Sequence, residues 1–168
     1  MTLTRTVPSP LGELLLAGEG DVLTGLWFTG HEPAPRIGPA TADATSDTGA
    51  FGDAVRQLDE FFTGRRTSFD LALDLRGTPF QLRVWEALAR IPYGATVTYG
   101  DVAAEAGRPG AARAAGHAIA RNPVSIVVPC HRVVGGGGRL TGYAGGLDRK
   151  RALLALERSS VAGAATRR

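Results

Sequence analysis

The chain has 168 residues and a formal net charge of +3, with 43% hydrophobic and 21% charged side chains. This composition is typical of a soluble globular protein, and no apolar run reaches the roughly 18 residues that a membrane-spanning helix needs. The first residues lack the layout of a secretory signal, and a single cysteine excludes an internal disulfide. We therefore expect a cytoplasmic protein. Its three histidines are widely spaced, so we expect no metal site.

The charge is unevenly distributed along the chain. Residues 1–80 carry 6 basic and 11 acidic side chains, whereas residues 81–157 carry 10 basic and 5 acidic ones. A basic half indicates contact with a polyanion such as nucleic acid. A genome that favours arginine codons would also explain why 18 of the 19 basic residues are arginine. The charge pattern leaves both explanations open.

The N-terminal half contains strand and helix patterns. Two apolar segments, 14–17 and 22–28, flank the turn sequence GEGD and predict strands. Residues 29–49 are rich in Pro, Gly, Ala and Thr, which predicts a long mobile loop. Apolar residues recur at helical spacing over 51–62. The alternating sequence TSFDLALDL then predicts a strand with one solvated face.

Three helices are predicted in the following part of the chain. Thr78 and Gln81 have the spacing of a capping box around Pro79, which suits the first helical position. Thr98, three residues before Asp101, marks a second helix start, and the sequence AARAAGHAIAR predicts a third helix. Two short helices joined by the turn GRPG, beside net positive charge, resemble a helix-turn-helix. Such helix pairs also occur in ordinary protein cores.

The third predicted helix consists almost entirely of alanine and glycine. Small side chains let a backbone approach another surface closely. The helix therefore either packs tightly inside the protein or enters a DNA groove, with Arg113 as its projecting group. An ordinary major-groove reader would carry more polar side chains for base edges, so we expect weak sequence preference.

Cys130 lies in the sequence VVPCHRVV, next to His131. A lone cysteine among apolar residues is often a small buried hydrophobe. A thiolate is also a strong nucleophile, and a nearby histidine favours its formation. Asn122 upstream could pin a turn, and Glu157 could orient the histidine. Alternatively, Glu157 is exposed and pairs with a neighbouring arginine.

The chain resembles the O6-alkylguanine-DNA alkyltransferases, also called methylated-DNA–protein-cysteine methyltransferases. The resemblance lies in NPVSIVVPCHRVV, in GYAGGLDRKRALLALE, and in FQLRVWEALARIPYGATVTYGDVAAEAGRPGAARAAG upstream. It covers residues 75–158 and is weaker before them. It implies DNA repair by a single irreversible transfer of the alkyl group from O6-alkylguanine, and from O4-alkylthymine, in double-stranded DNA to the protein's own cysteine. It also implies base flipping, no cofactor and a monomer in solution, and it leaves cooperative binding on DNA open.

The resemblance also implies a role for individual residues. Cys130 would accept the alkyl group, His131 would deprotonate it through a water, and Glu157 would orient His131. Asn122 would hold the active-site turn, and Tyr99 would donate to a ring nitrogen of the guanine. The substrate pocket would include Val133, Tyr143, Ala144 and Ser125. The DNA contacts would come from Arg113, which enters the duplex in place of the flipped base, and from Tyr99, Ala112, Gly116 and Arg121.

Three positions depart from the family pattern. Ala144 stands where serine is frequent, Ser125 where some members have proline, and His117 where a small residue is frequent. The N-terminal half has no cysteine, so the structural zinc of some members cannot form in the same way. Three other functions fit the sequence less well. A relative that only binds damage lacks the cysteine, a regulatory relative carries an additional cysteine-bearing domain, and a Cys-His ester hydrolase would need an oxyanion motif that the sequence does not show.

We therefore predict an α/β (α+β) protein in three parts. Residues 1–75 would form an N-terminal domain, ribonuclease H-like, with a small antiparallel sheet and a helix. Residues 76–160 would form a winged-helix-like helix-turn-helix domain that binds DNA and contains the active site. Residues 161–168 would form a disordered tail, because they are small and end in charge.

Overall fold

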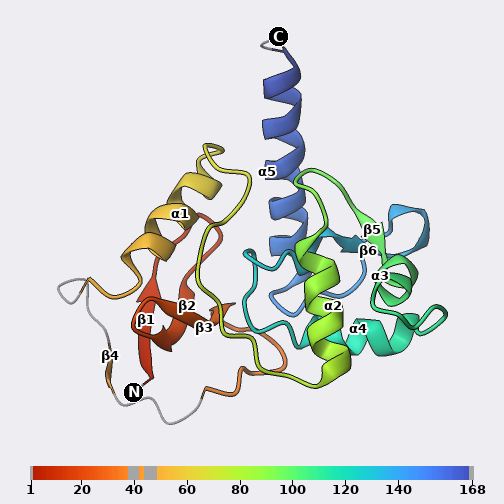
Figure 1. Cartoon of the computed structure of the whole chain (residues 1–168). Helices are drawn as coiled ribbons and strands as arrows, with labels where there is room; N and C mark the ends of the chain where they lie inside the picture. The colour runs from red at the N-terminus through yellow and green to blue at the C-terminus, as the bar shows by residue number, and fades with distance from the viewer. Residues whose placement is uncertain (1, 38–41, 44–48, 167–168) are drawn as a thin grey trace.

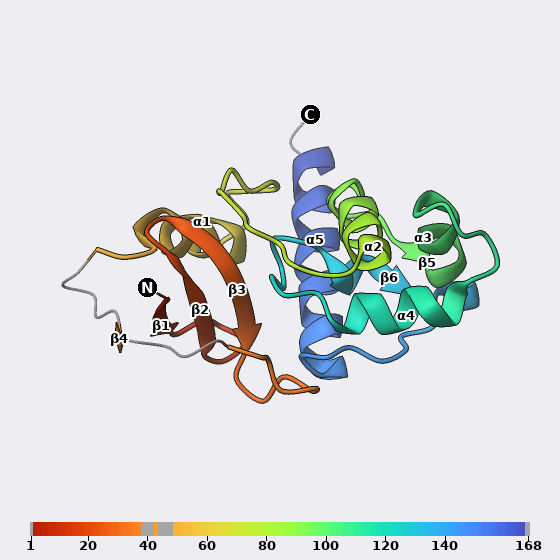
Figure 2. The ribbon, with the colours of Figure 1, turned by 60° about the horizontal axis from the view of Figure 1, so that its bottom comes forward.

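The computed structural model describes residues 2–37, 42–43 and 49–166 of the chain. Figures 1 and 2 show a sheet with one helix, built by the first half of the chain, next to a group of helices built by the second half. The prediction of a mixed α/β fold with a small antiparallel sheet is confirmed. Within the ranges given, no helix combines the length and the apolar character that crossing a lipid bilayer requires.

The first half is built around a four-stranded sheet with the strand order β3-β2-β1-β4. The strands are β1 (Leu3–Val7), β2 (Leu14–Glu19), β3 (Val22–Phe28) and β4 (Ala42–Asp43). β2 pairs antiparallel with both β1 and β3, whereas β4 runs parallel to β1. The predicted helix over 51–62 is α1 (Gly52–Phe62), and its apolar stripe packs into the core that the sheet lines.

The alternating pattern of TSFDLALDL led us to predict a strand, and this prediction is wrong for most of the segment. Only Leu73 forms a bridge, with Leu23 of β3. The side chain of Gln57 on α1 makes the backbone hydrogen bonds to this segment that a neighbouring strand would otherwise make. Its Nε2 donates to the carbonyl of Asp70 at 2.9 Å, and its Oε1 accepts from the Asp70 N–H at 2.9 Å. The alternating apolar residues therefore cover the core beside α1 instead of extending the sheet.

Two other expectations for this half need correction. β1 is a full strand of the sheet, although the sequence pattern indicated only the two strands that follow it. The predicted loop over 29–49 contains β4, because this short segment pairs with β1. Residues 38–41 and 44–48 lie outside the described ranges, so the expected mobility of that loop stays a prediction.

The second half contains four helices and short connecting elements within the described residues. They are α2 (Pro79–Ala89), β5 (Val97–Thr98), α3 (Tyr99–Glu105), α4 (Ala112–Ala120), the 3-10 turn η2 (Cys130–Arg132), β6 (Val133–Val134), the 3-10 turn η3 (Gly136–Gly138) and α5 (Leu147–Thr166). Both predicted helix starts are confirmed. Thr78 with Gln81 and Thr98 with Asp101 form reciprocal capping boxes, in which each side chain accepts from the other residue's N–H. β5 and β6 pair in parallel.

The predicted disordered tail at 161–168 is wrong for residues 161–166, because α5 continues to Thr166. A helix that is already formed extends at little cost through residues of high helix propensity, and alanine has the highest. Val161 also packs against the backbone at Gly94, where a Cβ would lie 2.7 Å from a Val161 methyl group. Residues 167–168 lie outside the described part of the chain.

The two halves share a hydrophobic core and are tied together by backbone hydrogen bonds. Leu26 of β3 donates to Pro123 O and accepts from the N–H of Ser125, both at 2.8 Å. The guanidinium of Arg149 on α5 donates to Leu11 O and to Thr29 O, each at 2.9 Å. These contacts place β3 and the turn after it directly against the segment that leads to Cys130.

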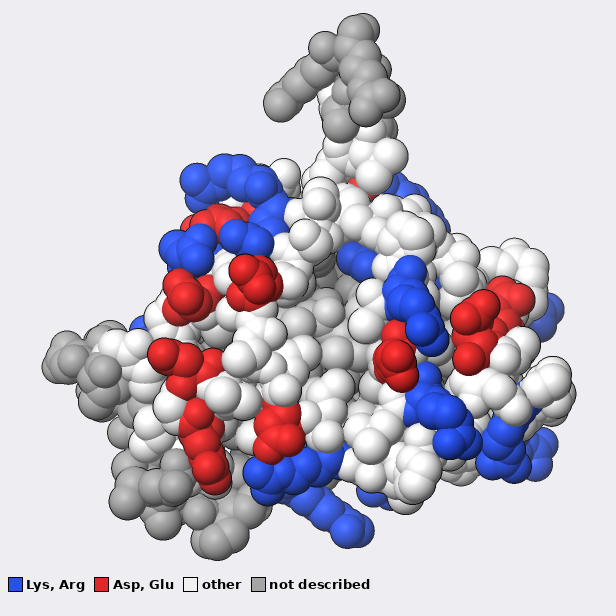
Figure 3. Space-filling view, in the orientation of Figure 1, with Lys and Arg blue, Asp and Glu red and all other residues white. Residues whose placement is uncertain are grey.

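The sequence's charge asymmetry is partly visible on the surface. On the face drawn in Figure 3, acidic side chains lie mainly over the N-terminal half, whereas the helical half shows arginine and acidic residues side by side. Part of the acidic charge is locally neutralised. Glu60 pairs with Arg56 at 2.7 Å and with Arg66 at 2.8 Å.

Candidate active site

The turn between α4 and Cys130 is held by the side chain of Asn122. This buried amide donates through Nδ2 to Val128 O at 2.7 Å and accepts at Oδ1 from the N–H of Val124 at 3.0 Å. Ile126 inside the turn has a φ of 72°, which a β-branched residue rarely adopts. The Asn122 hydrogen bonds and the ties to β3 stabilise this unusual backbone, and the turn places Cys130 at the start of η2.

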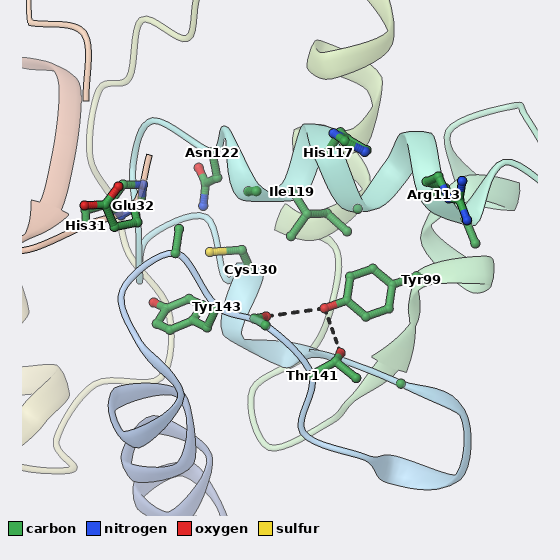
Figure 4. A pocket seen from close by; sticks show the side chains of 16 residues that line it. His31, Glu32, Tyr99, Arg113, His117, Ile119, Asn122, Cys130, Thr141 and Tyr143 are labelled. Carbon is green, nitrogen blue, oxygen red and sulfur yellow. Dashed lines mark hydrogen bonds between the residues drawn. The ribbon is translucent and has the colours of Figure 1, made fainter. Parts of the chain in front are cut away.

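Cys130 lies on the wall of a cavity of about 750 Å³. The residue is 5% exposed. Figure 4 shows its sulfur pointing into the space between α4 and the segment that carries Tyr143. The predicted site residues that line this cavity are Tyr99, Ala112, Arg113, Gly116, Asn122, Cys130, Tyr143 and Ala144. The structure therefore brings together residues from four separate parts of the sequence.

A buried charged cluster includes His131, the residue next to Cys130. His131 Nε2 lies 2.8 Å from Glu157 Oε1. Arg132 donates to the same carboxylate oxygen through Nε at 3.0 Å and through a terminal nitrogen at 2.7 Å. All three side chains are less than a tenth exposed. The alternative of an exposed Glu157 is therefore wrong, and Arg132 joins the cluster although no sequence pattern selected it.

The cluster sets the protonation of the site. Burial lowers the pKa of His131, although the neighbouring Glu157 opposes this. In the neutral ring Nε2–H donates to the carboxylate, so Nδ1 keeps its lone pair. Burial raises the pKa of the Cys130 thiol, against the opposing influence of Asn122 and Lys150. The resting sulfur is therefore a thiol, and a proton acceptor is needed when it reacts.

The cluster predicts how stability depends on pH. Burial alone would raise the pKa of Glu157, but hydrogen bonds from His131 and Arg132 lower it to about 2. The folded protein therefore holds the ionised carboxylate more tightly than the unfolded chain does. This stabilisation, about 3 kcal/mol by linkage, is present above pH 4.5 and is lost as the pH falls toward 2. The pKa of His131 is also lower in the folded protein, so stability falls further as the pH drops below 6.5. Urea unfolding between pH 7 and pH 3 measures the decline, and a flat profile would contradict it.

Unpartnered polar atoms gather around Cys130. Among the described residues, four buried side-chain polar atoms have no hydrogen-bond partner: His31 Nδ1, Tyr93 Oη, His131 Nδ1 and Tyr143 Oη. Two of these residues, His31 and Tyr143, line the cavity, and His131 is next to Cys130. Such atoms are rare in folded proteins and often mark a place where water or a ligand binds. Their concentration here favours this cavity as the functional site.

The remaining predicted residues lie near the cavity or outside it. The Tyr99 hydroxyl accepts from Thr141 Oγ1 at 3.0 Å and donates to Gly142 O at 3.4 Å (Figure 4). Ser125 and Val133 are buried and do not line the cavity. Arg121 lines a neighbouring hollow, which shares His31, Ala120 and Asn122 with this cavity. The structure therefore does not bring Arg121 to the same cavity as Cys130.

Besides Arg132, several residues at this site were not predicted from the sequence, and three of them carry a charge or can carry one. His31 and Glu32, from the N-terminal half, line the cavity. Lys150 is 1% exposed, and its ammonium donates to Thr141 O at 3.1 Å and to Gly142 O at 3.4 Å. Lys150 is the only lysine of the chain, which is a signal that could have marked it. No pattern in the sequence places His31 beside Cys130.

Comparisons with known proteins agree over most of the chain. Residues 79–159 match the family model described as "6-O-methylguanine DNA methyltransferase, DNA binding domain", and residues 3–75 match its "ribonuclease-like domain". The chain belongs to this family. Methylated-DNA–protein-cysteine methyltransferases of Mycobacterium tuberculosis and Bacillus subtilis are 55% and 44% identical to it. The matches cover 92% of both chains for the former, and 95% of this chain and 98% of the relative for the latter.

Solved structures of the 6-O-methylguanine DNA methyltransferase family have the same fold. The chain is similar to the M. tuberculosis OGT protein in complex with DNA, with a TM-score of 0.87 and 53% identity over 94% of both chains. It is also similar to the crystal structure of the M. tuberculosis O6-methylguanine methyltransferase, with a TM-score of 0.84 and 53% identity over 95% of this chain and 94% of the other. The resemblance stated from the sequence is therefore confirmed, and it extends through the N-terminal half.

Proposed function

We propose that this protein repairs alkylated DNA by transferring the alkyl group from O6 of guanine to Cys130, once per molecule. The observation that carries the proposal is the placement of Cys130 on the cavity wall, next to the buried pair of His131 and Glu157. The names of its relatives support the same activity. We extend the proposal to O4-alkylthymine, to a monomer as the active form and to the cytoplasm as its location.

The substrate is double-stranded DNA whose damaged base is flipped out. An alkyl group on O6 lies inside the base stack, so the base must leave the duplex to reach a buried sulfur. Ala112 and Gly116 line the cavity on α4 and leave its surface flat enough to approach a minor groove. The exposed Arg113 would fill the gap left by the base. Arg121, exposed just after α4, would contact backbone phosphate.

The transfer is an in-line displacement at the alkyl carbon. The bond from Cys130 Sγ to that carbon forms while its bond to O6 breaks, and the bonding electron pair stays with the guanine. The thiol proton would pass through a water to Nδ1 of His131, and Glu157 would stabilise the imidazolium that results. Tyr99 would protonate a ring nitrogen of the leaving guanine. Its hydroxyl would then regain a proton, ultimately the one that left the thiol of Cys130 for the water and His131. The thioether product has no ready route to hydrolysis, so the protein stops after one transfer.

The remaining residues of the proposed pocket would orient the flipped base. The main-chain carbonyls of Cys130 and Val133 would accept hydrogen bonds from its exocyclic amine. The ring of Tyr143 would form a wall, with Ser125 beside its hydroxyl. The N–H of Ala144 would face O6, where a main-chain donor serves without the serine that other members carry. Asn122 would hold the turn before Cys130 in position, so that the sulfur stays aligned with these groups.

Mixing the protein with a duplex that carries one O6-methylguanine tests the proposal. We expect intact mass to rise by one methyl group on Cys130, with one transfer per molecule even when the lesion is in excess. A duplex with unmodified guanine is the control and should leave the mass unchanged. If the mass stays constant while the lesion duplex binds more tightly than the control duplex, the protein is a damage-sensing module and the proposed transfer is wrong.

A further inference from the structure

The N-terminal half contributes a wall of the cavity that contains Cys130. His31, in the turn after β3, lines this cavity together with Asn122 and Ala144, and it is 7% exposed. In the view of Figure 4, the sulfur of Cys130 points toward the side on which His31 lies and away from Tyr99. An alkyl group longer than methyl, held at that sulfur, would therefore extend toward His31.

The backbone fixes His31 in this position from both sides. Its own N–H donates to Phe28 O at 3.1 Å, and the N–H of Glu32 donates to Ala144 O at 2.8 Å. Gly30 has a φ of 87°, which allows the tight turn between these two anchors. The second hydrogen bond joins the turn to the segment that carries the pocket residues Tyr143 and Ala144. The two hydrogen bonds therefore fix the backbone that carries the imidazole of His31.

One buried polar atom on this side of the cavity, Nδ1 of His31, has no hydrogen-bond partner. The buried hydroxyl of Tyr143 also makes no hydrogen bond, although Ser125 and Cys130 lie beside it. Burial lowers the pKa of His31, although Glu32 opposes this, so the ring is neutral at neutral pH and either accepts or donates a hydrogen bond. A site with buried, unpaired polar groups favours a ligand that pairs with them over an apolar ligand of the same shape.

We propose that His31 determines which O6 adducts the protein repairs, and that it favours alkyl groups that end in a hydrogen-bonding atom over apolar groups of equal length. This inference rests on the proposed alkyl transfer and specifies its substrate class. The hydroxyl or carbonyl end of such an adduct would pair with Nδ1 of His31. The hydroxyl of Tyr143, which lines the same cavity, would offer a second partner. The N-terminal half would thereby take part in substrate selection.

The test compares O6-(2-hydroxyethyl)guanine with O6-propylguanine, which have the same chain length and differ in the terminal atom. Single-turnover rates are measured for both adducts in one duplex sequence, and their ratio is compared between variants. Within one variant, the ratio cancels effects of folding and of DNA affinity that are common to both adducts. Comparing the ratio between variants then cancels the intrinsic reactivity of the two adducts. We expect His31→Leu to lower the ratio of hydroxyethyl to propyl about fivefold, the value of one neutral hydrogen bond.

Two further variants sharpen the result. His31→Asn keeps a polar atom near the position of Nδ1 and should keep the ratio within about twofold of the unmodified protein. His117→Ala removes the other histidine that lines the cavity, at an exposed position on α4, and should leave the ratio unchanged. An unchanged ratio in His31→Leu, with both rates altered by the same factor, would overturn the inference. An unmodified protein that transfers no methyl group would instead overturn the proposed function, and this inference with it.

Discussion

Cys130→Ser is expected to bind the lesion duplex and to transfer no methyl group that can be measured. A hydroxyl oxygen is a far weaker nucleophile than a thiolate, and its proton is much harder to remove at neutral pH. We expect the single-turnover rate to fall at least about 10³-fold, which corresponds to roughly 4 kcal/mol of barrier. Serine is nearly isosteric with cysteine, so the cavity and the neighbouring His131 should keep their places. Quenched-flow transfer of a labelled methyl group measures the rate.

Lesion binding by the same variant is the control for this experiment. A dissociation constant within about threefold of the unmodified protein would show that the fold and the DNA surface are intact, since this change is less than about 1 kcal/mol. Methyl transfer to another residue at the original rate would contradict the assignment of Cys130. Complete loss of lesion binding would instead show that Cys130, a residue that is 5% exposed, mainly supports the fold.

Glu157→Gln is expected to destabilise the protein by about 3 kcal/mol and to slow the transfer about 100-fold. The carboxylate pairs with both His131 and Arg132 inside the protein. Removing one partner from a buried ion pair leaves an uncompensated charge, which costs about 3–5 kcal/mol. Without the carboxylate, the imidazolium that forms at His131 during the reaction also loses its stabilising neighbour. Urea unfolding at pH 7 and single-turnover kinetics measure the two effects.

Glu105→Gln is the matched control for that prediction. Glu105 ends α3 at an exposed position, and exposed substitutions of this kind change stability by about 0.5 kcal/mol or less. The pH profile adds a further criterion. The Glu157→Gln protein should lose stability less steeply than the unmodified protein below pH 4.5, because no carboxylate remains there to be protonated. Equal stability of the two variants at pH 7 would contradict the importance of the buried pair.

Local signals predicted the helices well. The capping boxes at Thr78 and Thr98 need only residues three positions apart, so the sequence pattern contains all the information. The strand predicted in TSFDLALDL failed because pairing depends on a distant partner. Gln57, on another element, satisfies the backbone at Asp70. Helix extension into residues 161–166 depended on α5 already being formed.

The residues of the candidate site also fall into two groups, those that a local motif marks and those that only tertiary packing brings together. Cys130 and His131 are adjacent in the chain, so a short motif marks them. The contact between His131 and Glu157 spans 26 positions. The sequence offered Glu157 only as one candidate partner, and the family resemblance favoured it. His31 lies about 100 positions from Cys130 and reaches the cavity through hydrogen bonds between the two halves. Such an arrangement arises from tertiary packing, which composition and periodicity do not encode.

The left-handed backbone of Ile126 shows what determines the geometry of the turn that places the sulfur. A β-branched residue at this φ costs of order 1–3 kcal/mol. Such a conformation persists only where the surrounding structure imposes it, and here the Asn122 amide and the hydrogen bonds to β3 do so. The shape of the turn is therefore imposed by tertiary contacts and is not a preference of its own residues, so the position of Cys130 depends on both halves of the chain.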